Sequence, residues 1–290
     1  MSILKTEDLT FIYSQGTPYA HTAVDHVNIE FEKGELVGII GHTGSGKSTL
    51  IQQFNGLLKP TSGRVFVDGT DIWADPSKIR DVRFKVGLVF QYPEYQLFEE
   101  TVYKDISFGP KNMGIEGAEL DSRIKEAAAF VGLGEELLEK SPFELSGGQK
   151  RRVAIAGVLA MRPEILILDE PTAGLDPKGR ERILGQIREY HRKTGGLVLL
   201  VSHSMEDVAN YATKALVVNE SKIFMYDDVD KVFAHTAELK QMGLSAPQIS
   251  DVFELLAARG LPVPTGVYTV ERAKRELLRL LGKGGDGDAR

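Results

Sequence analysis

The sequence contains no cysteine, which excludes a disulfide framework and a thiolate metal site. It also lacks apolar runs approaching the roughly 20 residues of a membrane-spanning helix, so we expect no membrane span in this chain. Positive charge is not in excess, because 35 Lys and Arg stand against 41 Asp and Glu, and nucleic acid is not an expected partner. The 290 residues suffice for one large domain and an appendage.

Short apolar segments alternate with stretches of helical periodicity over residues 1–225. The pattern predicts strands at 3–13, 24–32, 35–40, 65–69, 86–90, 166–168, 197–201 and 216–218, and helices at 47–57, 177–193 and 204–213. Such alternation predicts an α/β fold with a parallel sheet covered on both faces. Residues from about 92 to 160 are mostly helical in pattern, which predicts a second lobe inserted between strands of the sheet.

The pattern changes after residue 225. Short amphipathic helices are predicted at 229–233, 237–242, 247–258 and 268–281. The Gly- and Asp-rich residues from about 283 to 290 are typical of a disordered tail. We therefore expect a main domain over 1–225 and a mostly helical C-terminal extension over 226–290.

A glycine-rich loop is predicted between the strand at 35–40 and the helix that follows. It consists of Gly41, His42, Thr43, Gly44, Ser45, Gly46, Lys47, Ser48 and Thr49. This matches the complete phosphate-loop pattern, in which backbone N–H groups and the positive end of the helix surround phosphates. Lys47 would bridge the β- and γ-phosphates, and Ser48 would bind Mg²⁺. The alternative, a glycine-rich turn that matches by chance, leaves the flanking strand and helix unexplained.

Four polar residues follow apolar strands, at the edge where ligands bind in such sheets. Asp169 would hold Mg²⁺ through its water shell, and Glu170 would orient or deprotonate an attacking water. Gln91 could reach both the Mg²⁺ and that water, and His203 could contact the γ-phosphate. Any one of these residues alone would more often be structural or solvated. Together with the phosphate loop they predict a site for hydrolysis of a nucleoside triphosphate.

Two further features concern the nucleotide less directly. Tyr13 is a candidate to stack on an adenine ring, with a core aromatic on a strand as the alternative. The pentapeptide Leu145-Ser146-Gly147-Gly148-Gln149 precedes a helix, and its two glycines would present bare N–H groups to an anion. An ordinary helix cap is the alternative explanation of that pentapeptide and is also physically sound.

Taken in order, these strings resemble the ATP-binding-cassette (ABC) ATPases over about residues 3–225, including Leu166-Ile-Leu-Asp-Glu170 and Gly174-Leu-Asp176. The pentapeptide is the most specific element, since other phosphate-loop families lack it. The resemblance implies a phosphate-loop (RecA-like) core, an antiparallel β subdomain and a helical signature subdomain. It also implies a head-to-tail dimer with two ATP molecules at its interface. Ser146, Gly147, Gly148 and Gln149 would then cap the partner's γ-phosphate, and Asp176 would couple the two sites.

A narrower resemblance lies in Gln91–Val102 and Asp105–Asn112. These segments are similar to the ATPases of energy-coupling factor (ECF) transporters, which import vitamins and some metal ions. Members of that group often have His where this chain has Tyr95, and the substitution keeps an aromatic ring. The extension after residue 225 resembles the part that helps hold two such ATPases together, although an isolated helical cap would explain it as well.

In ECF transporters the first of these segments faces a groove that receives arginine-bearing coupling helices of a transmembrane component. Carboxylates that could pair with guanidinium groups, and aromatic rings that could stack on them, are Glu94, Glu99, Glu100, Tyr92, Tyr95 and Phe98. We therefore expect the transmembrane partner to dock near Tyr92–Glu100. The alternative is a solvated acidic loop with core aromatics.

The resemblance implies an ATP- and Mg²⁺-dependent energy-coupling subunit of an ECF importer, peripheral on the cytoplasmic face of the cell membrane. Its partners would be a second, identical or related ATPase, the transmembrane component and, indirectly, a substrate-binding membrane protein. The alternatives are another class of ABC transporter or a soluble ABC ATPase. A DNA-repair ATPase would need a coiled-coil insertion, and no sustained heptads separate Lys47 from Ser146. A translation factor would usually carry two cassettes, and a kinase would leave the pentapeptide unexplained.

Overall fold

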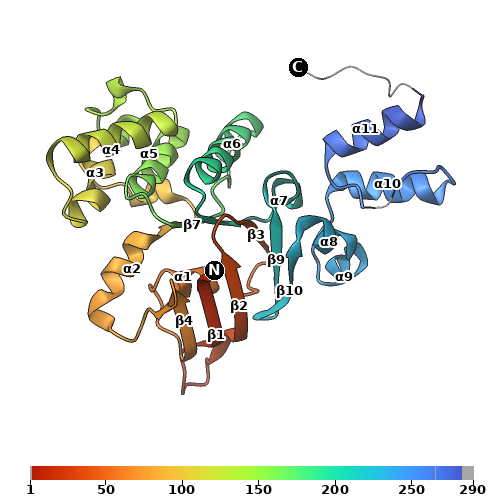
Figure 1. Ribbon diagram of the computed structural model, residues 1–290, viewed down its shortest axis with the longest axis horizontal. Coiled ribbons are helices and arrows are strands. Elements are labelled where there is room, and N and C mark those ends of the chain that lie inside the picture. Colours follow the sequence, from red (N-terminus) through yellow and green to blue (C-terminus); the bar gives the residue numbers. More distant parts are fainter. Residues whose placement is uncertain (1, 265, 283–290) are drawn as a thin grey trace.

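The computed structural model describes residues 2–264 and 266–282. A six-stranded sheet forms the centre of the molecule, with the strand order β10-β9-β3-β8-β7-β6 (Figure 1). Its strands are β3 (Leu36–Ile40), β6 (Val86–Val89), β7 (Ile165–Asp169), β8 (Leu197–Val201), β9 (Lys214–Asn219) and β10 (Lys222–Asp228). Neighbouring strands are parallel except β9 and β10. Every residue of β3, β7 and β8 is buried, as expected for a parallel sheet covered on both faces.

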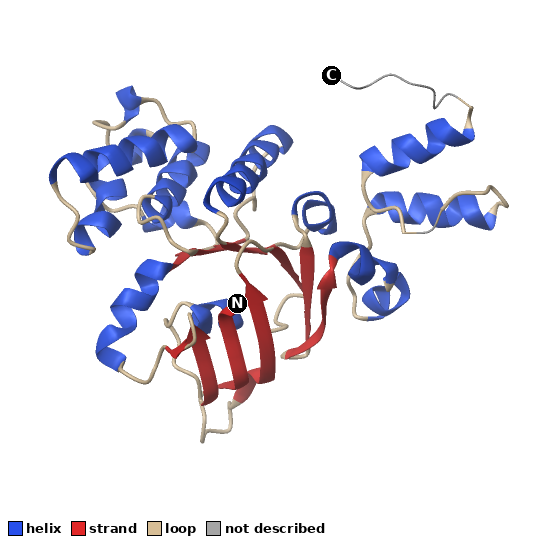
Figure 2. Ribbon diagram, in the orientation of Figure 1, coloured by secondary structure: helices blue, strands red, loops and turns tan. Residues whose placement is uncertain are grey.

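A second, antiparallel sheet has the strand order β2-β1-β4-β5 (Figure 2). It consists of β1 (Ser2–Tyr13), β2 (His21–Glu32), β4 (Ser62–Val67) and β5 (Thr70–Asp71). One buried cluster joins the inner face of this sheet to the central sheet and to α1 (Lys47–Phe54), with Phe31 and Phe54 fully buried in it. The two sheets therefore share a core, and the antiparallel β subdomain expected from the resemblance is present.

Helices cover the rest of the molecule. They are α2 (Ile79–Lys85), α3 (Val102–Asn112), α4 (Gly117–Phe130), α5 (Gly147–Leu159), α6 (Pro177–Thr194), α7 (Met205–Tyr211), α8 (Val229–Ala234), α9 (Thr236–Gln241), α10 (Gln248–Ala258) and α11 (Val270–Leu280). Short 3₁₀ turns occur at Pro76–Lys78, Pro93–Gln96, Glu135–Leu137 and Pro142–Glu144. Within residues 2–264 and 266–282, no helix has both the length and the apolar character to cross a membrane.

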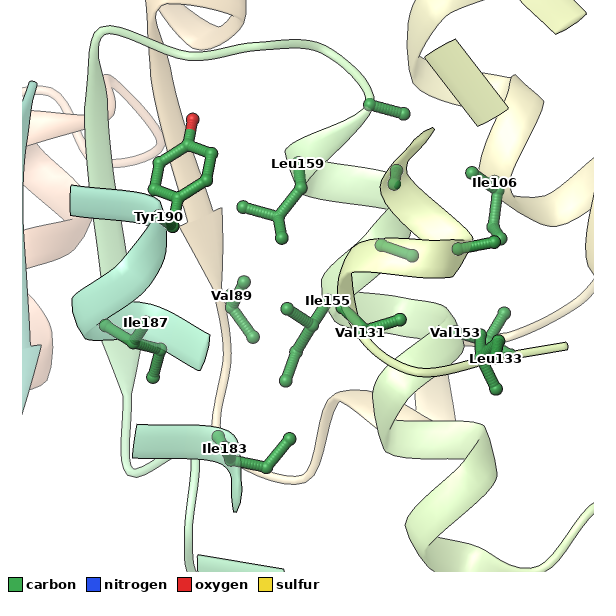
Figure 3. Close-up of a cluster of buried hydrophobic side chains, with 14 of the residues drawn as sticks. Val89, Ile106, Val131, Leu133, Val153, Ile155, Leu159, Ile183, Ile187 and Tyr190 are labelled. Atoms are coloured by element: carbon green, nitrogen blue, oxygen red, sulfur yellow. The ribbon is translucent and has the colours of Figure 1, made fainter. Parts of the chain in front are cut away.

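Helices α3, α4 and α5 form a lobe beside the central sheet, as Figure 1 shows. A buried cluster links this lobe to the core (Figure 3), because Ile155 and Leu159 of α5 face Ile183, Ile187 and Tyr190 of α6. The helix that begins at the pentapeptide is thereby fixed to the helix that begins beside Asp176.

The C-terminal helices lie on the opposite side of the molecule from that lobe (Figure 1). Helices α8 and α9 pack on the central sheet through Val232, Phe233 and Leu239, whereas α10 and α11 share a small separate cluster. Strand β10 runs to Asp228, so the central sheet continues beyond the expected boundary at residue 225. The predicted disordered tail at about 283–290 lies outside the described residues.

Candidate active site

A cleft of about 470 Å³ lies where β3, β6, β7 and β8 reach their carboxyl ends. Its lining residues are Tyr13, His21, Ala23, Thr43, Gly44, Gly46, Lys47, Ser48, Thr49, Gln91, Asp169, Glu170, Val201 and His203. Gly41, His42 and Ser45 belong to the same loop without lining the cleft. The structure thus brings together the residues predicted for phosphate, Mg²⁺ and water, whereas Ser146–Gln149 and Asp176 lie outside the cleft.

The glycines of the loop allow neighbouring strands to approach its backbone. A Cβ on Gly46 would lie 2.0 Å from the carbonyl oxygen of Ala23 on β2, and Gly46 has a φ of +102°. A Cβ on Gly41 would lie 2.3 Å from the carbonyl oxygen of Val218 on β9. Because both distances are far below van der Waals contact, side chains at these positions would push the loop off the two sheets. The loop is therefore clamped between β2 and β9.

Lys47 places its ammonium group inside the loop. Its Nζ donates to the carbonyl oxygens of Gly41 at 2.7 Å and His42 at 2.9 Å, and the residue is 6% exposed. Burial lowers the pKa of Lys47, while the nearby carboxylates of Glu170 and Asp169 oppose that change. The two carbonyl groups and the two carboxylates hold the positive charge in a fixed place within the cleft.

The oxygen donors near the loop suit Mg²⁺. Burial raises the pKa of Asp169, and the neighbouring Ser48 hydroxyl and Lys47 ammonium oppose that rise. No group of three or more His, Cys, Asp or Glu able to hold a metal occurs in the described part of the chain. Mg²⁺ needs only one or two protein ligands when waters and phosphates complete its octahedron. Ser48, Asp169 and the nearby Gln91 are compatible with that kind of site and with no closed protein cage.

The fit of a phosphate group is supported by an unpaired atom in the loop. Ser45 is 1% exposed, and its hydroxyl oxygen has no hydrogen-bond partner within the described residues. Buried hydroxyl groups are rarely left unpaired, because burial without a partner costs free energy. A loop that combines this hydroxyl group with the Lys47 ammonium is therefore compatible with an anionic ligand such as a nucleotide phosphate.

Glu170 has the properties expected of a general base. It adopts a left-handed backbone conformation with φ of 51°, and its N–H donates to the carbonyl oxygen of Val201 at 3.1 Å. His203 Nε2 lies 3.2 Å from Glu170 Oε1 without forming a hydrogen bond, and Oε1 is a buried atom with no hydrogen-bond partner in the described residues. Burial, with the neighbouring Asp169 charge, raises the pKa of Glu170 to about 7. Burial and the Lys47 charge lower the pKa of His203, which favours the neutral imidazole.

The raised pKa of Glu170 predicts a pH-dependent stability of the ligand-free protein. Below pH 4.5 the carboxyl is protonated in both the folded and unfolded chain, whereas above about pH 7 the folded chain must bury an ionised carboxylate. We therefore expect Glu170→Gln to match the wild type at pH 4.5 and to exceed it at pH 8 by at most about 3 kcal/mol. Urea unfolding at the two pH values measures this, with exposed Glu164→Gln as the control. A gain that is equal at both pH values would contradict it.

Tyr13 and His21 form one wall of the cleft. The two residues are directly opposite in the β1–β2 pair, so their side chains share a face of the antiparallel sheet. Tyr13 is 41% exposed, and its hydroxyl lies 3.1 Å from Thr49 Oγ1. Its placement is compatible with stacking on a base. His21 was not predicted from the sequence, although its position opposite Tyr13 across the β1–β2 connection was the available signal.

The pentapeptide forms the helix cap that was considered as an alternative. Ser146 Oγ accepts from Gln149 N, and Gln149 Oε1 accepts from Ser146 N at 3.0 Å, which together make a capping box at the start of α5. Gly147 and Gly148 are not explained by that cap. Both are exposed, neither has a positive φ, and a Cβ at either would meet nothing within 4 Å. Glycine costs up to about 1 kcal/mol of stability relative to Ala in a helix, and no contact among the described residues requires glycine at these two positions.

Arg151 joins three functional segments and was missed by the sequence analysis. It is 3% exposed and donates from Nε and Nη2 to the two Glu94 carboxylate oxygens, at 2.9 and 2.7 Å. Its Nη1 donates to the carbonyl oxygen of Ala173, and its guanidinium lies 5.8 Å from the centroid of the Tyr92 ring. The expectation that Glu94 meets an incoming arginine is therefore wrong, because an arginine of this chain already occupies it.

The other aromatic residues of the segment face outward. Tyr95 is 84% exposed, Phe98 is 59% exposed and Phe108 on α3 is 50% exposed. The Phe98 and Phe108 rings pack edge to face with centroids 5.1 Å apart. Glu100 pairs with Lys104 on the surface. We call the contacting rings of Phe98 and Phe108 the aromatic patch, whereas the Tyr95 ring is tilted against Tyr92 with centroids 6.3 Å apart. Exposed clusters of this kind mark interaction surfaces more often than isolated exposed rings do.

Comparison with known proteins decides the family. The family model described as "ABC transporter" matches residues 24–173. The energy-coupling factor transporter ATP-binding protein EcfA2 of Caldanaerobacter subterraneus is 56% identical over 278 residues, which cover 96% of this chain and 97% of that protein. The EcfA2 protein of Clostridium tetani is 54% identical, with 96% of both chains covered. The chain belongs to the ABC ATPases of energy-coupling factor transporters.

Solved structures agree with the assignment to the ABC ATPases. CbiO1 from Clostridium perfringens, described as part of the ABC transporter complex cbiONQ, superposes with a TM-score of 0.74 and 40% identity, covering 87% of this chain and 99% of that one. The ATP-binding cassette MJ0796, in a dimeric post-hydrolysis state bound to ADP and Pi, gives a TM-score of 0.71 and 29% identity, covering 78% and 98%. The predicted fold class and the resemblance to ECF ATPases are thus confirmed.

Proposed function

We propose that this ECF ATPase hydrolyses ATP in the described cleft and couples the reaction to the import of vitamins or other micronutrients. One observation carries the proposal: the residues proposed for hydrolysis line one cleft, while the exposed glycines of the pentapeptide, Gly147 and Gly148, lie outside it and contact nothing in residues 2–264 and 266–282 that would require glycine. Because this exposed glycine pair cannot reach the cleft of its own chain, a second ATPase is needed whose nucleotide the pair can contact. A soluble ABC ATPase is less well supported, since the relatives named above are transporter proteins.

The residues of the cleft have separate tasks in hydrolysis. The Lys47 ammonium neutralises phosphate charge, and Ser48, Gln91 and Asp169 provide oxygen atoms for Mg²⁺. When bound, Mg²⁺ would supply further neutralisation of the phosphates. The Glu170 carboxylate accepts a proton from the attacking water, for which a pKa of about 7 is suited at neutral pH. His203, next to Glu170, orients neutral Nε2 toward the reacting phosphate.

A head-to-tail dimer would complete each site. Ser146, Gly147 and Gly148 lie exposed at the N-terminus of α5, where the helix dipole and bare N–H groups favour a phosphate bound by the other ATPase. We further propose that the C-terminal extension supports the dimer. Apolar side chains of α10 and α11 are exposed there, among them Leu255 at 62% and Val270 at 64%.

The aromatic patch is the proposed docking surface for the transmembrane component. That component would hold the ATPase at the cytoplasmic face of the membrane, and the substrate-binding membrane protein would be reached only through it. With Glu94 occupied by Arg151, the exposed rings are the better candidates for contact. Exposed aromatic rings of this kind often contribute most of the binding free energy once a partner buries them.

We expect Phe98→Asp to reduce recovery of the multi-span membrane subunit in an affinity pull-down roughly tenfold or more, because a carboxylate would be buried against the partner. Tyr19→Asp is the matched control, since Tyr19 is 85% exposed in the β1–β2 connection, away from the patch. ATP binding should stay unchanged in both variants. Equal recovery from both would exclude the patch as the docking surface. If the wild type recovers only non-membrane partners, the transport proposal itself is wrong while the ATPase assignment stands.

A further inference from the structure

The loop that carries Asp176 is tied to the β8–α7 segment at both of its ends. At its start, Glu170 donates a backbone hydrogen bond to β8 and lies 3.2 Å from His203 Nε2. At its end, Arg180 Nε on α6 lies 2.9 and 3.0 Å from the two carboxylate oxygens of Asp207 on α7. The loop is therefore connected to the β8–α7 segment at its start through Glu170 and at its end through the Arg180–Asp207 ion pair.

The ion pair keeps Arg180 and Asp207 together because the Asp207 carboxylate is buried. Its side chain is 8% exposed, and its second contact is Thr172 Oγ1 of the same loop, at 3.5 Å. A buried carboxylate separated from its cation is costly, so Asp207 must follow any displacement of Arg180. The backbone N–H of Asp207 donates to Ser204 Oγ at 3.2 Å, directly after His203. Displacement of Asp207 therefore reaches the residue next to His203.

The backbone of Arg180 is also hydrogen-bonded to Asp176. The Asp176 side chain accepts from Gly179 N at 2.9 Å, and the Asp176 carbonyl oxygen accepts from Arg180 N at 2.9 Å. Both bonds belong to the first turn of α6 and connect Asp176 to Arg180. Asp176 itself is exposed, so an approaching molecule can contact it.

We propose that the Arg180–Asp207 ion pair is a positioning device that transmits displacement of Asp176 by the second ATPase to His203. The proposal rests on the proposed dimer. Contact with Asp176 shifts the first turn of α6, Arg180 carries Asp207 and the start of α7 with it, and His203 changes its position relative to Glu170. Arg180 and Asp207 do not touch the reacting groups and act only through His203.

A kinetic double-mutant cycle on the assembled pair of ATPases tests the proposal. We expect Arg180→Gln and Asp176→Ala each to lower kcat roughly two- to thirtyfold with the affinity for ATP unchanged. The double variant should be no slower than the slower single variant, because both changes break one connection. If the two losses of kcat multiply in the double variant, the proposal is wrong. The ion pair would then act only on stability or through its electrostatic field at Glu170. An Asp176→Ala protein with wild-type kcat would instead refute the proposed dimer contact, and the connection with it.

Two further variants keep the test decisive. Arg180→Lys retains the charge and should recover part of kcat, which a general packing defect would not allow. If Arg180→Gln fails to fold, Asp207→Asn breaks the same pair while leaving Arg180, 38% exposed, accessible to water. The same non-multiplicative result is expected from it. Arg162→Gln, which breaks the surface pair with Glu126, should combine multiplicatively with Asp176→Ala.

Discussion

Glu170→Gln is expected to bind ATP, to lose hydrolysis by a factor of about 10²–10⁴, and to accumulate a closed dimer. The amide of Gln keeps the size of the carboxylate and the strained backbone position, but it cannot act as a base toward water. In the proposed dimer ATP binding would close the two ATPases and hydrolysis would open them, so arrest before hydrolysis would leave the closed state populated. Phosphate release measures the rate, and light scattering with Mg²⁺ and ATP measures the dimer.

The matched control is Glu164→Gln. Glu164 is an exposed carboxylate immediately before β7, at the end of that strand opposite to Asp169. It should hydrolyse ATP like the wild type and form no persistent dimer. Undiminished turnover in Glu170→Gln would remove Glu170 from its proposed role as base.

Arg151→Ala is expected to destabilise the folded protein by about 3–5 kcal/mol, because it leaves the half-buried Glu94 carboxylate without its cation. The change also removes the hydrogen bond to the Ala173 carbonyl oxygen and the contact with the Tyr92 ring. Urea denaturation measures the loss. Arg162→Ala breaks an ion pair in which both side chains are more than half exposed, and it should cost less than about 1 kcal/mol.

Replacing both members of the buried pair separates the charge effect from packing. In Glu94→Leu with Arg151→Met no charge is stranded, so much of the lost stability should return. A double variant that is as unstable as Arg151→Ala would show that the backbone hydrogen bonds of Arg151, rather than its charge, are responsible for its effect.

The sequence predicts the central strands well because β3, β7 and β8 are buried on both faces and contain mainly apolar residues. Strand β10 escapes prediction because it is at the sheet edge, where the apolar Phe224 is exposed together with Lys222 and Asp228, so apolar character and burial do not alternate together along it. Helix α2 is missed for a related reason, since it contains no buried residue that would give it a periodic apolar stripe. Visible patterns therefore follow burial, and peripheral elements carry a weak signal.

The candidate site divides in the same way. The phosphate loop, Asp169 and Glu170 are predictable because their spacing along the chain is itself the motif. The Arg151–Glu94 pair joins residues 57 positions apart, and charged side chains at such a distance have no local pattern. Sequence reasoning consequently assigned Glu94 to an external partner, although the fold supplies an internal one.

The walls of the cleft belong to two different sheets. Tyr13 and His21 come from the antiparallel sheet, whereas the phosphate loop, Asp169 and His203 follow strands of the central sheet. A molecule that touches both walls is in effect a non-covalent crosslink between the two halves of the domain. Heat or denaturant would then have to break this crosslink before the sheets separate, so the ligand concentration sets how firmly the domain is held together.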